Sequence, residues 1–210
     1  IIDNDCKSVL FNKINEIAPN TDYTKLDTNI GMSKAANLAF QKIKTKYFLF
    51  LTADTIIDEK NVLNLLKIYK KYNNVGLVCP IHLNIQNRYS GNYFCPPLNR
   101  VLKRNKFQKN MYNSLSKIIP SGDFSAFNVW GAPILLQTSL INKIGFFDRN
   151  IFMFFEDVDL CDRIKKYGYE IIETPSAVCI HHKGASTSTT IHDLFNTISS
   201  YKFSELYYFS

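Results

Sequence analysis

The sequence lacks any long apolar run, and no stretch approaches the roughly 20 residues that a membrane-spanning helix needs. Its five cysteines are scattered and form no C-x-x-C pair, so neither a disulfide framework nor a structural zinc site is expected. This cysteine usage fits a reducing compartment, and we expect a cytoplasmic protein. With 46% hydrophobic and 20% charged residues, the 210-residue chain has the composition of one globular domain.

The sequence also lacks the signatures of nucleic-acid binding. Its net charge is +7, and its lysines gather in three short clusters, at Lys42–Lys46, Lys67–Lys71 and Leu102–Lys109. Charge runs of this kind usually keep a helix face or a loop solvated. No zinc-finger spacing, RNP-like aromatic string or basic heptad accompanies them, so no nucleic-acid partner is expected. Peripheral contact with the anionic inner face of a membrane, or binding of a phosphate-bearing substrate, is the alternative that the basic charge leaves open.

What is present in the first half is an alternation of short apolar runs with helical patterns. This alternation is typical of βαβ units around a mostly parallel sheet flanked by helices. Tyr47–Leu51 is expected to form a buried strand, Asp58 to cap the next helix, and Val75–Cys79 to form the following strand. Residues 84–124 show weak periodicity and predict a long irregular excursion of the functional kind.

Helical spacing also marks the N-terminal segment and the region after residue 156. The apolar spacing in Ser8–Ala18 predicts a helix that Pro19 stops, and Asp157–Tyr167 predicts a second helix that Gly168 ends. Beyond residue 186, a Ser/Thr-rich link leads into an aromatic amphipathic segment. Three cysteines in apolar stretches are expected in the core, whereas His82 and His192 are expected at the surface; the cysteines are Cys79, Cys161 and Cys179.

Two chain segments carry residues suited to metal binding. Asp54 directly follows the predicted strand at Tyr47–Leu51, where ligands bind in open α/β sheets. A carboxylate there suits Mg²⁺ or Mn²⁺ bridging a diphosphate, and an ordinary turn aspartate is the alternative. His181 ends a later apolar run and can supply an imidazole ligand, unless it is simply a solvated residue at a strand end.

The sharpest feature is an acidic helix start after an aromatic cluster. Glu156, Asp157 and Asp159 follow Phe152–Phe155 and open the predicted helix. Acids at this position favour the helix dipole, so capping is one explanation. Capping needs one carboxylate, however, and a carboxylate in an aromatic-walled cleft is suited to act as general base on an acceptor hydroxyl.

Taken in order, these pieces resemble the inverting family-2 glycosyltransferases, especially their rhamnosyltransferase-like branch. The resemblance is carried by an ordered set of short matches from residue 3 to about residue 186. They are Asp3-Asn4, Asn29-Ile30-Gly31 with Asn37, Thr52-Ala53-Asp54-Thr55, Gly131-Ala132, Gly145–Asp148, Phe155–Arg163, Gly168-Tyr169 and His181–Ser186. The family implies a GT-A-type α/β fold. Because the first match is already a strand end, we expect residues 1–186 to form the catalytic domain without its first strand, and residues 187–210 to follow as a separate segment.

The resemblance also implies roles for individual residues. Asp3 would contact the nucleotide base, with Asn29 and Gly31 beside it, while Asp54 and His181 would hold the metal. Asp157 would be the catalytic base, Glu156 would support acceptor binding, and the sugar and acceptor site would include Trp130, Gly131 and Asp159. The alternative interpretation of Trp130 is an ordinary core residue. The motif reads Thr52-Ala53-Asp54, so its first acid is absent.

The implied reaction is transfer of a sugar from dTDP-rhamnose or a UDP-hexose to a hydroxyl of a glycan or lipid-linked acceptor. It would proceed with inversion and with Mg²⁺ or Mn²⁺. Two alternatives stay open from the sequence: a nucleotidyltransferase on a similar sheet, which would release pyrophosphate, and a non-catalytic relative that binds a glycan or a membrane partner.

Overall fold

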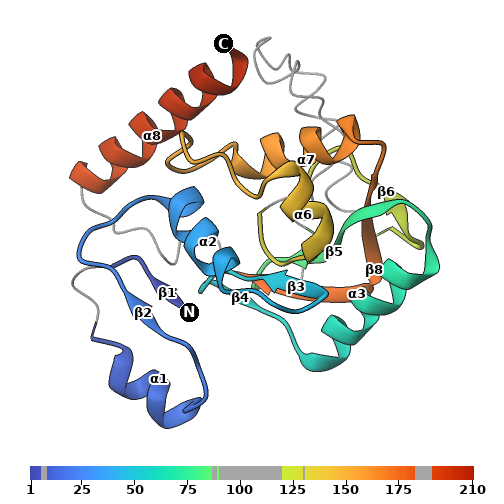
Figure 1. Cartoon of the computed structure of the whole chain (residues 1–210), viewed down its shortest axis with the longest axis horizontal. Helices are drawn as coiled ribbons and strands as arrows, with labels where there is room; N and C mark the ends of the chain where they lie inside the picture. Colours follow the sequence, from blue (N-terminus) through green and yellow to red (C-terminus); the bar gives the residue numbers. More distant parts are fainter. Residues whose placement is uncertain (6–8, 87–88, 90–119, 130, 183–190) are drawn as a thin grey trace.

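The computed structural model describes residues 1–5, 9–86, 89, 120–129, 131–182 and 191–210. In chain order the described elements are β1 (Ile2–Asp3), α1 (Phe11–Ile17), β2 (Thr24–Lys25), α2 (Met32–Gln41), β3 (Tyr47–Phe50), β4 (Thr55–Ile56), α3 (Glu59–Lys71), β5 (Val75–Leu83), β6 (Phe124–Ser125), β7 (Ile134–Gln137), α6 (Thr138–Ile144), α7 (Glu156–Lys166), β8 (Glu170–His181) and α8 (Ile191–Phe209). Figure 1 shows helices on both sides of a central sheet.

The central sheet has the order β3-β7-β5-β8-β4, and β6 pairs with β8 off this path. The expectation of a mostly parallel sheet is wrong in its detail. Only β5 and β8 pair in parallel among the described strands of this sheet, while β3–β7, β5–β7, β4–β8 and β6–β8 are antiparallel. An apolar run predicts burial but carries no information on direction, and β7 enters between β3 and β5 in the reverse sense.

Alternation along the strands divides the core into two layers. Leu77 and Ile171 face α2, α6 and α7, whereas their neighbours Val78 and Ile172 face α3. Since side chains alternate between the faces of a strand, each strand of the sheet feeds both layers. The three described cysteines, Cys79, Cys161 and Cys179, are free and buried, as the sequence predicts.

Local signals place several element ends correctly. Asp58 caps α3, since its Oδ1 accepts a hydrogen bond from the Asn61 backbone N–H at 2.8 Å. Gly168 follows α7 with a φ of 81°, a conformation open to glycine. The helix predicted at Ser8–Ala18 is present as α1, although none of its residues is buried. Within the described residues, no helix is both long and apolar enough to cross a bilayer.

Candidate active site

Asp54 and His181 meet at the edge of the central sheet. Asp54 lies in the loop between β3 and β4, and β4 pairs with the end of β8 so that Thr55 faces His181. The His182 N–H donates to the Asp54 carbonyl oxygen at 2.8 Å, which locks the two chain segments together. The carboxylate oxygen Oδ2 of Asp54 then lies 3.3 Å from Nε2 of His181. Residues 127 positions apart in the sequence therefore form one site.

The Asp54–His181 pair fits a divalent cation. Both side chains are largely buried, with 13% and 16% of their surface exposed, and Thr52 donates to the other carboxylate oxygen of Asp54 at 2.7 Å. Two ligands on neighbouring corners of an octahedral Mg²⁺ or Mn²⁺ site lie about 3 Å apart, given bond lengths near 2.1 Å. The described residues contain no group of three or more His, Cys, Asp or Glu side chains that could hold a metal. An ion here would accordingly need further ligands from phosphate or water.

Glu156 and Asp157 lie at the first turn of α7, beside Gly131. A Cβ atom built on Gly131 would lie 3.6 Å from Cβ of Asp157 and 3.9 Å from its Oδ2. Gly131 therefore lies within van der Waals range of the Asp157 side chain. Trp130, expected to wall the sugar site, lies outside the described residues.

The two carboxyl groups of this turn differ in their electrostatics. Oε2 of Glu156 is buried and has no hydrogen-bond partner among the described residues. Burial, together with the neighbouring charge of Asp157, raises the pKa of Glu156 to about 8. At neutral pH Glu156 therefore retains its proton and can donate a hydrogen bond, while Asp157 accepts one from the Val158 N–H at 2.8 Å.

Asp159, the third acid, is engaged elsewhere. Its Oδ2 binds Arg163 through Nη2 at 2.6 Å and Nε at 2.9 Å. The same guanidinium donates to the carbonyl oxygens of Ile144 and Gly145, at 3.0 and 2.7 Å. Asp159 thus orients the arginine that ties α7 to the end of α6, and its expected role at the acceptor stays a prediction.

The residues expected at the nucleotide base form an interlocked turn. The Asn4 side chain donates to Asn29 Oδ1 at 2.9 Å and accepts from the Ile30 N–H at 3.0 Å. Asp3 accepts hydrogen bonds from the Tyr23 hydroxyl and from the Asp5 N–H. The segments around Asp3 and Asn29 are therefore adjacent, as the resemblance implies.

Gly31 connects this turn to the segment before α7. It has a φ of 85°, and a Cβ atom there would lie only 2.5 Å from the carbonyl oxygen of Phe152. The next N–H, of Met32, donates to that same oxygen at 2.7 Å. The position requires glycine both for its backbone conformation and for the close approach of Phe152. The turn at Asn29 and Gly31 consequently abuts the aromatic segment that leads to Glu156.

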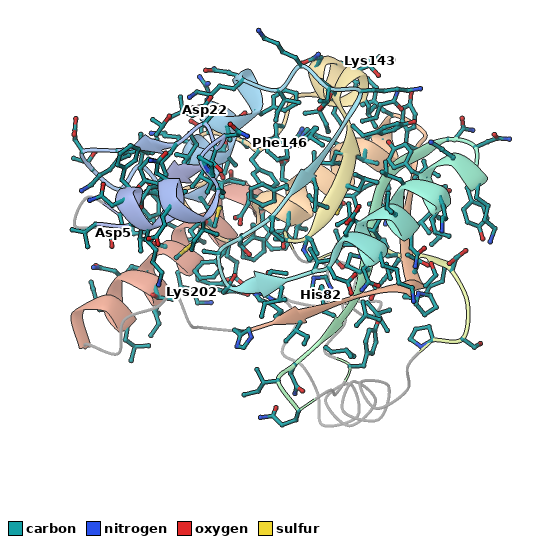
Figure 2. All side chains as sticks on the ribbon, turned by 90° about the horizontal axis from the view of Figure 1, so that it is seen from below. Asp5, Asp22, His82, Lys143, Phe146 and Lys202 are labelled. Carbon is teal, nitrogen blue, oxygen red and sulfur yellow. The ribbon has the colours of Figure 1, made fainter. Side chains whose placement is uncertain are left out.

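His82 is the residue of this region that the sequence analysis missed. It lies on β5 (Figure 2) and is fully buried, so the expectation of a surface histidine is wrong. Its Nε2 lies 2.8 Å from the Ala132 carbonyl oxygen, and its ring centroid lies 6.0 Å from that of His181. Because a carbonyl oxygen only accepts, Nε2 carries the proton. A histidine inside a continuous apolar run was the available signal of burial.

His82 joins the two halves of the site. Its ring lies near that of His181, and its hydrogen bond holds the carbonyl of Ala132, the residue after Gly131, which borders Asp157. The side chain of His192, the other histidine expected at the surface, lies outside those that the structure describes.

The family model for glycosyl transferase family 2 matches residues 5–129, more than half of the chain. The chain belongs to glycosyl transferase family 2. The match includes Asn29, Gly31 and Asp54, and it ends before α7 and His181.

Two curated proteins are similar to parts of this family-2 chain. The N-acetylglucosaminyl-diphospho-decaprenol L-rhamnosyltransferase of Mycobacterium tuberculosis (strain ATCC 25618 / H37Rv) is 44% identical over 57 residues, which are 27% of this chain and 19% of the relative. The teichoic acid poly(glycerol phosphate) polymerase of Staphylococcus epidermidis is 35% identical over 77 residues, 36% of this chain and 10% of the relative. The matched segments thus span about a fifth or less of these relatives.

A solved structure supports the fold. The crystal structure of GalNAc-T7 with UDP, GalNAc and Mn²⁺ aligns with a TM-score of 0.62 at 13% identity, covering 94% of this chain and 40% of that one. At this identity the likeness concerns the fold alone, and the fold is of the GT-A type.

Proposed function

We propose that this chain transfers a sugar from a nucleotide-diphosphate donor to a hydroxyl group of a glycan or lipid-linked acceptor, with inversion. The observation that carries the proposal is the Asp54–His181 pair. His82 lies near His181 and binds Ala132, the residue after the glycine that borders Asp157. One end of this arrangement offers ligands for a cation on a diphosphate, and the other offers a carboxylate base. Membership of family 2 supports the same reaction.

In the proposed reaction, Asp157 removes the proton from the acceptor hydroxyl. The hydroxyl oxygen attacks the anomeric carbon, the bond between that carbon and the diphosphate oxygen breaks, and the nucleoside diphosphate leaves. General-base assistance of this kind is typically worth about 10²–10⁴-fold in rate. Because burial raises the pKa of Glu156, this residue can carry a proton and donate a hydrogen bond toward the acceptor.

Asp54 and His181 would hold Mg²⁺ or Mn²⁺. When bound, such an ion supplies Lewis-acid stabilisation of the negative charge on the leaving diphosphate. Carboxylate oxygens suit Mn²⁺, and the structural neighbour was crystallised with Mn²⁺ and UDP. The inverting course and the identity of the ion are parts of the proposal.

Asp3, Asn29 and Gly31 would receive the nucleotide. The proposed donor is dTDP-rhamnose or a UDP-hexose, supported by the rhamnosyltransferase relative and by the UDP-bound neighbour. The relative's name also supports a lipid-linked acceptor and hence work at the cytoplasmic face of a membrane. A direct test incubates the full chain with labelled dTDP-rhamnose or UDP-hexoses, Mn²⁺ and a polyprenyl-diphospho-N-acetylglucosamine acceptor.

The expected result is labelled acceptor together with one nucleoside diphosphate per sugar, abolished by EDTA. Release of pyrophosphate instead would identify a nucleotidyltransferase. Thermal unfolding with UDP, dTDP and GDP, each with and without Mn²⁺, names the base through the one nucleotide that stabilises the chain. Asp54→Ala should remove the Mn²⁺-dependent part of that shift, and an unchanged shift would exclude Asp54 from the metal site. No shift and no transfer with any donor would favour a non-catalytic binding protein.

A further inference from the structure

Two consecutive aromatic residues before α7 have an unusual backbone. Phe154 and Phe155 both have a φ of 69°, in the left-handed region that bulky residues rarely adopt. Phe155 is also the N-cap residue of α7, directly before Glu156 and Asp157. The direction in which the proposed base leaves the backbone therefore depends on a conformation that the local sequence does not favour. Neighbouring structure must hold it in place.

Helix α8 supplies the contacts that hold these two residues. In Figure 1 it lies along the segment that leads into α7. The Tyr201 ring lies 5.7 Å from the ring of Phe154 and 5.3 Å from that of Phe155, both within the range of favourable aromatic pairs. The Tyr208 ring packs against the same Phe155 ring in a tilted arrangement, with the centroids 5.6 Å apart. Both phenylalanines are thus covered by tyrosines of one helix.

A hydrogen bond fixes the backbone of this segment at the same point. Ser204 of α8 is buried, and its hydroxyl donates to the Met153 carbonyl oxygen at 2.7 Å. On the other side, the Phe152 carbonyl oxygen accepts from the Met32 N–H of α2. The left-handed pair is therefore held between α2 and α8. Helix α8 also binds α7 directly, because the Tyr208 hydroxyl donates a hydrogen bond to Asp162 of α7.

We infer that α8 is a positioning element of the active site, in which Tyr201 and Ser204 hold Phe154 and Phe155 in the left-handed conformation that aims Glu156 and Asp157. The catalytic part of this inference rests on the proposed function, and the structural part does not. Residues 191–210 then belong with the catalytic domain, whereas the sequence predicts a separate segment at residues 187–210. Tyr201 and Ser204 act through Phe155 and are positioning residues.

The first test compares three variants of the full chain. Tyr201→Ala should lower kcat at least tenfold and leave the KM for the donor and the affinity for Mn²⁺ within about twofold. Tyr201→Phe keeps the ring and should restore kcat. Phe203→Ala is the matched control, because this aromatic on the same helix is 74% exposed and touches neither phenylalanine in the described contacts. Equal kcat values for Tyr201→Ala and Phe203→Ala would overturn the catalytic part.

Amide hydrogen exchange tests the structural part without any assay of activity. The Asp159 N–H donates to the Phe155 carbonyl oxygen at 2.9 Å, the first hydrogen bond of α7. Tyr201→Ala should speed exchange of the amides of residues 155–159 at least tenfold, while amides of β5 stay protected. Unchanged exchange at residues 155–159 would overturn the inference. Should Tyr201→Ala fail to fold, Ser204→Ala, which removes only the hydroxyl bound to Met153, provides the same readout.

The two readouts also separate this inference from the proposed function. If Asp157→Asn retained full transfer activity, Asp157 would not be the base, yet faster exchange in Tyr201→Ala would still place α8 as the support of α7. If Asp157→Asn lost activity and Tyr201→Ala lost none, the proposed function would stand and the role of α8 would not.

Discussion

The two regions that the proposed reaction needs are held together in different ways. The N-terminal region, residues 1–5 and 9–31, has a two-stranded sheet of two residues per strand and a helix, α1, without a buried residue. Its turn depends on hydrogen bonds such as those between Asn4 and Asn29. The region around Asp54, His181 and Asp157 stands instead on a deep core, in which every residue of β5 except the last is buried.

This contrast assigns different tasks to the two regions. Polar side-chain contacts at a surface open locally at low cost, whereas core strands open only with global unfolding. The region proposed to bind the nucleotide is therefore the adaptable one, and the region proposed to carry the chemistry is the rigid one. Variants in the first should change binding, and variants in the second should change rate or stability.

The largest expected effect is on rate and comes from the rigid region. Asp157→Asn keeps the size of the side chain but cannot take a proton, so kcat should fall by about 10²–10⁴-fold. Donor binding should be nearly intact. Steady-state kinetics with labelled donor, and nucleotide titration by thermal shift, measure the two quantities.

The matched variant in the adaptable region is Asn29→Ala. It removes the oxygen that accepts from Asn4 and from the Gly31 N–H, and should raise the KM for the donor while changing kcat little. Near-normal turnover in Asp157→Asn would show that Asp157 is not the base. If Asn29→Ala lowered kcat and left the KM for the donor unchanged, the N-terminal region would not be the part of the site that binds the nucleotide.

The second effect is on stability, at the place where the two regions touch. Gly31→Ala adds a Cβ atom 2.5 Å from the Phe152 carbonyl oxygen, in a backbone with positive φ. Left-handed strain and overpacking together should cost about 2–5 kcal/mol of unfolding free energy. Gly122→Ala, with no atom within 4 Å of the new Cβ, is the control. Urea unfolding of both variants measures the two free energies. Equal stabilities would mean that the segment at Phe152 moves away from the new Cβ atom at little cost.

The third effect is on the pH dependence of stability, and it comes from a buried carboxyl group inside the rigid region. Glu173 on β8 is fully buried; its Oε1 accepts from the Tyr89 hydroxyl at 2.6 Å, and its Oε2 has no hydrogen-bond partner among the described residues. Burial raises the pKa of Glu173 to about 7. The folded state thus holds this proton more tightly than the unfolded state, and stability falls as the pH rises from the ordinary glutamate pKa through 7.

Glu173→Gln removes this titration and keeps an acceptor for Tyr89. Its advantage in unfolding free energy over the parent chain should grow between pH 4.5 and pH 8 by about 2–3 kcal/mol. Thermal unfolding at the two pH values measures the difference. A constant difference between pH 4.5 and pH 8 would show that Glu173 does not titrate in this range.

Sequence patterns predicted those parts of this molecule that depend on local chemistry. The Tyr47–Leu51 run became β3, Asp58 caps α3 and Gly168 ends α7, because each signal acts through neighbouring residues. Strand direction and the burial of His82 were missed, since both depend on which distant segment arrives alongside. For the site, the resemblance named Asp54 and His181 together, and their separation of 3.3 Å is what only the structure supplies.

The smallest expected effect tests the N-terminal helix α1, none of whose residues is buried. Ile17 at the end of α1 is 74% exposed, so Ile17→Gln should change the unfolding free energy by less than about 0.5 kcal/mol. Ile164 of α7 is fully buried in the core, and even the mild Ile164→Val should cost about 0.5–1.5 kcal/mol. Urea unfolding of both variants makes the comparison. A cost for Ile17→Gln equal to or above that of Ile164→Val would mean that α1 packs against something in solution, and the adaptable character of the N-terminal region would then have to be abandoned.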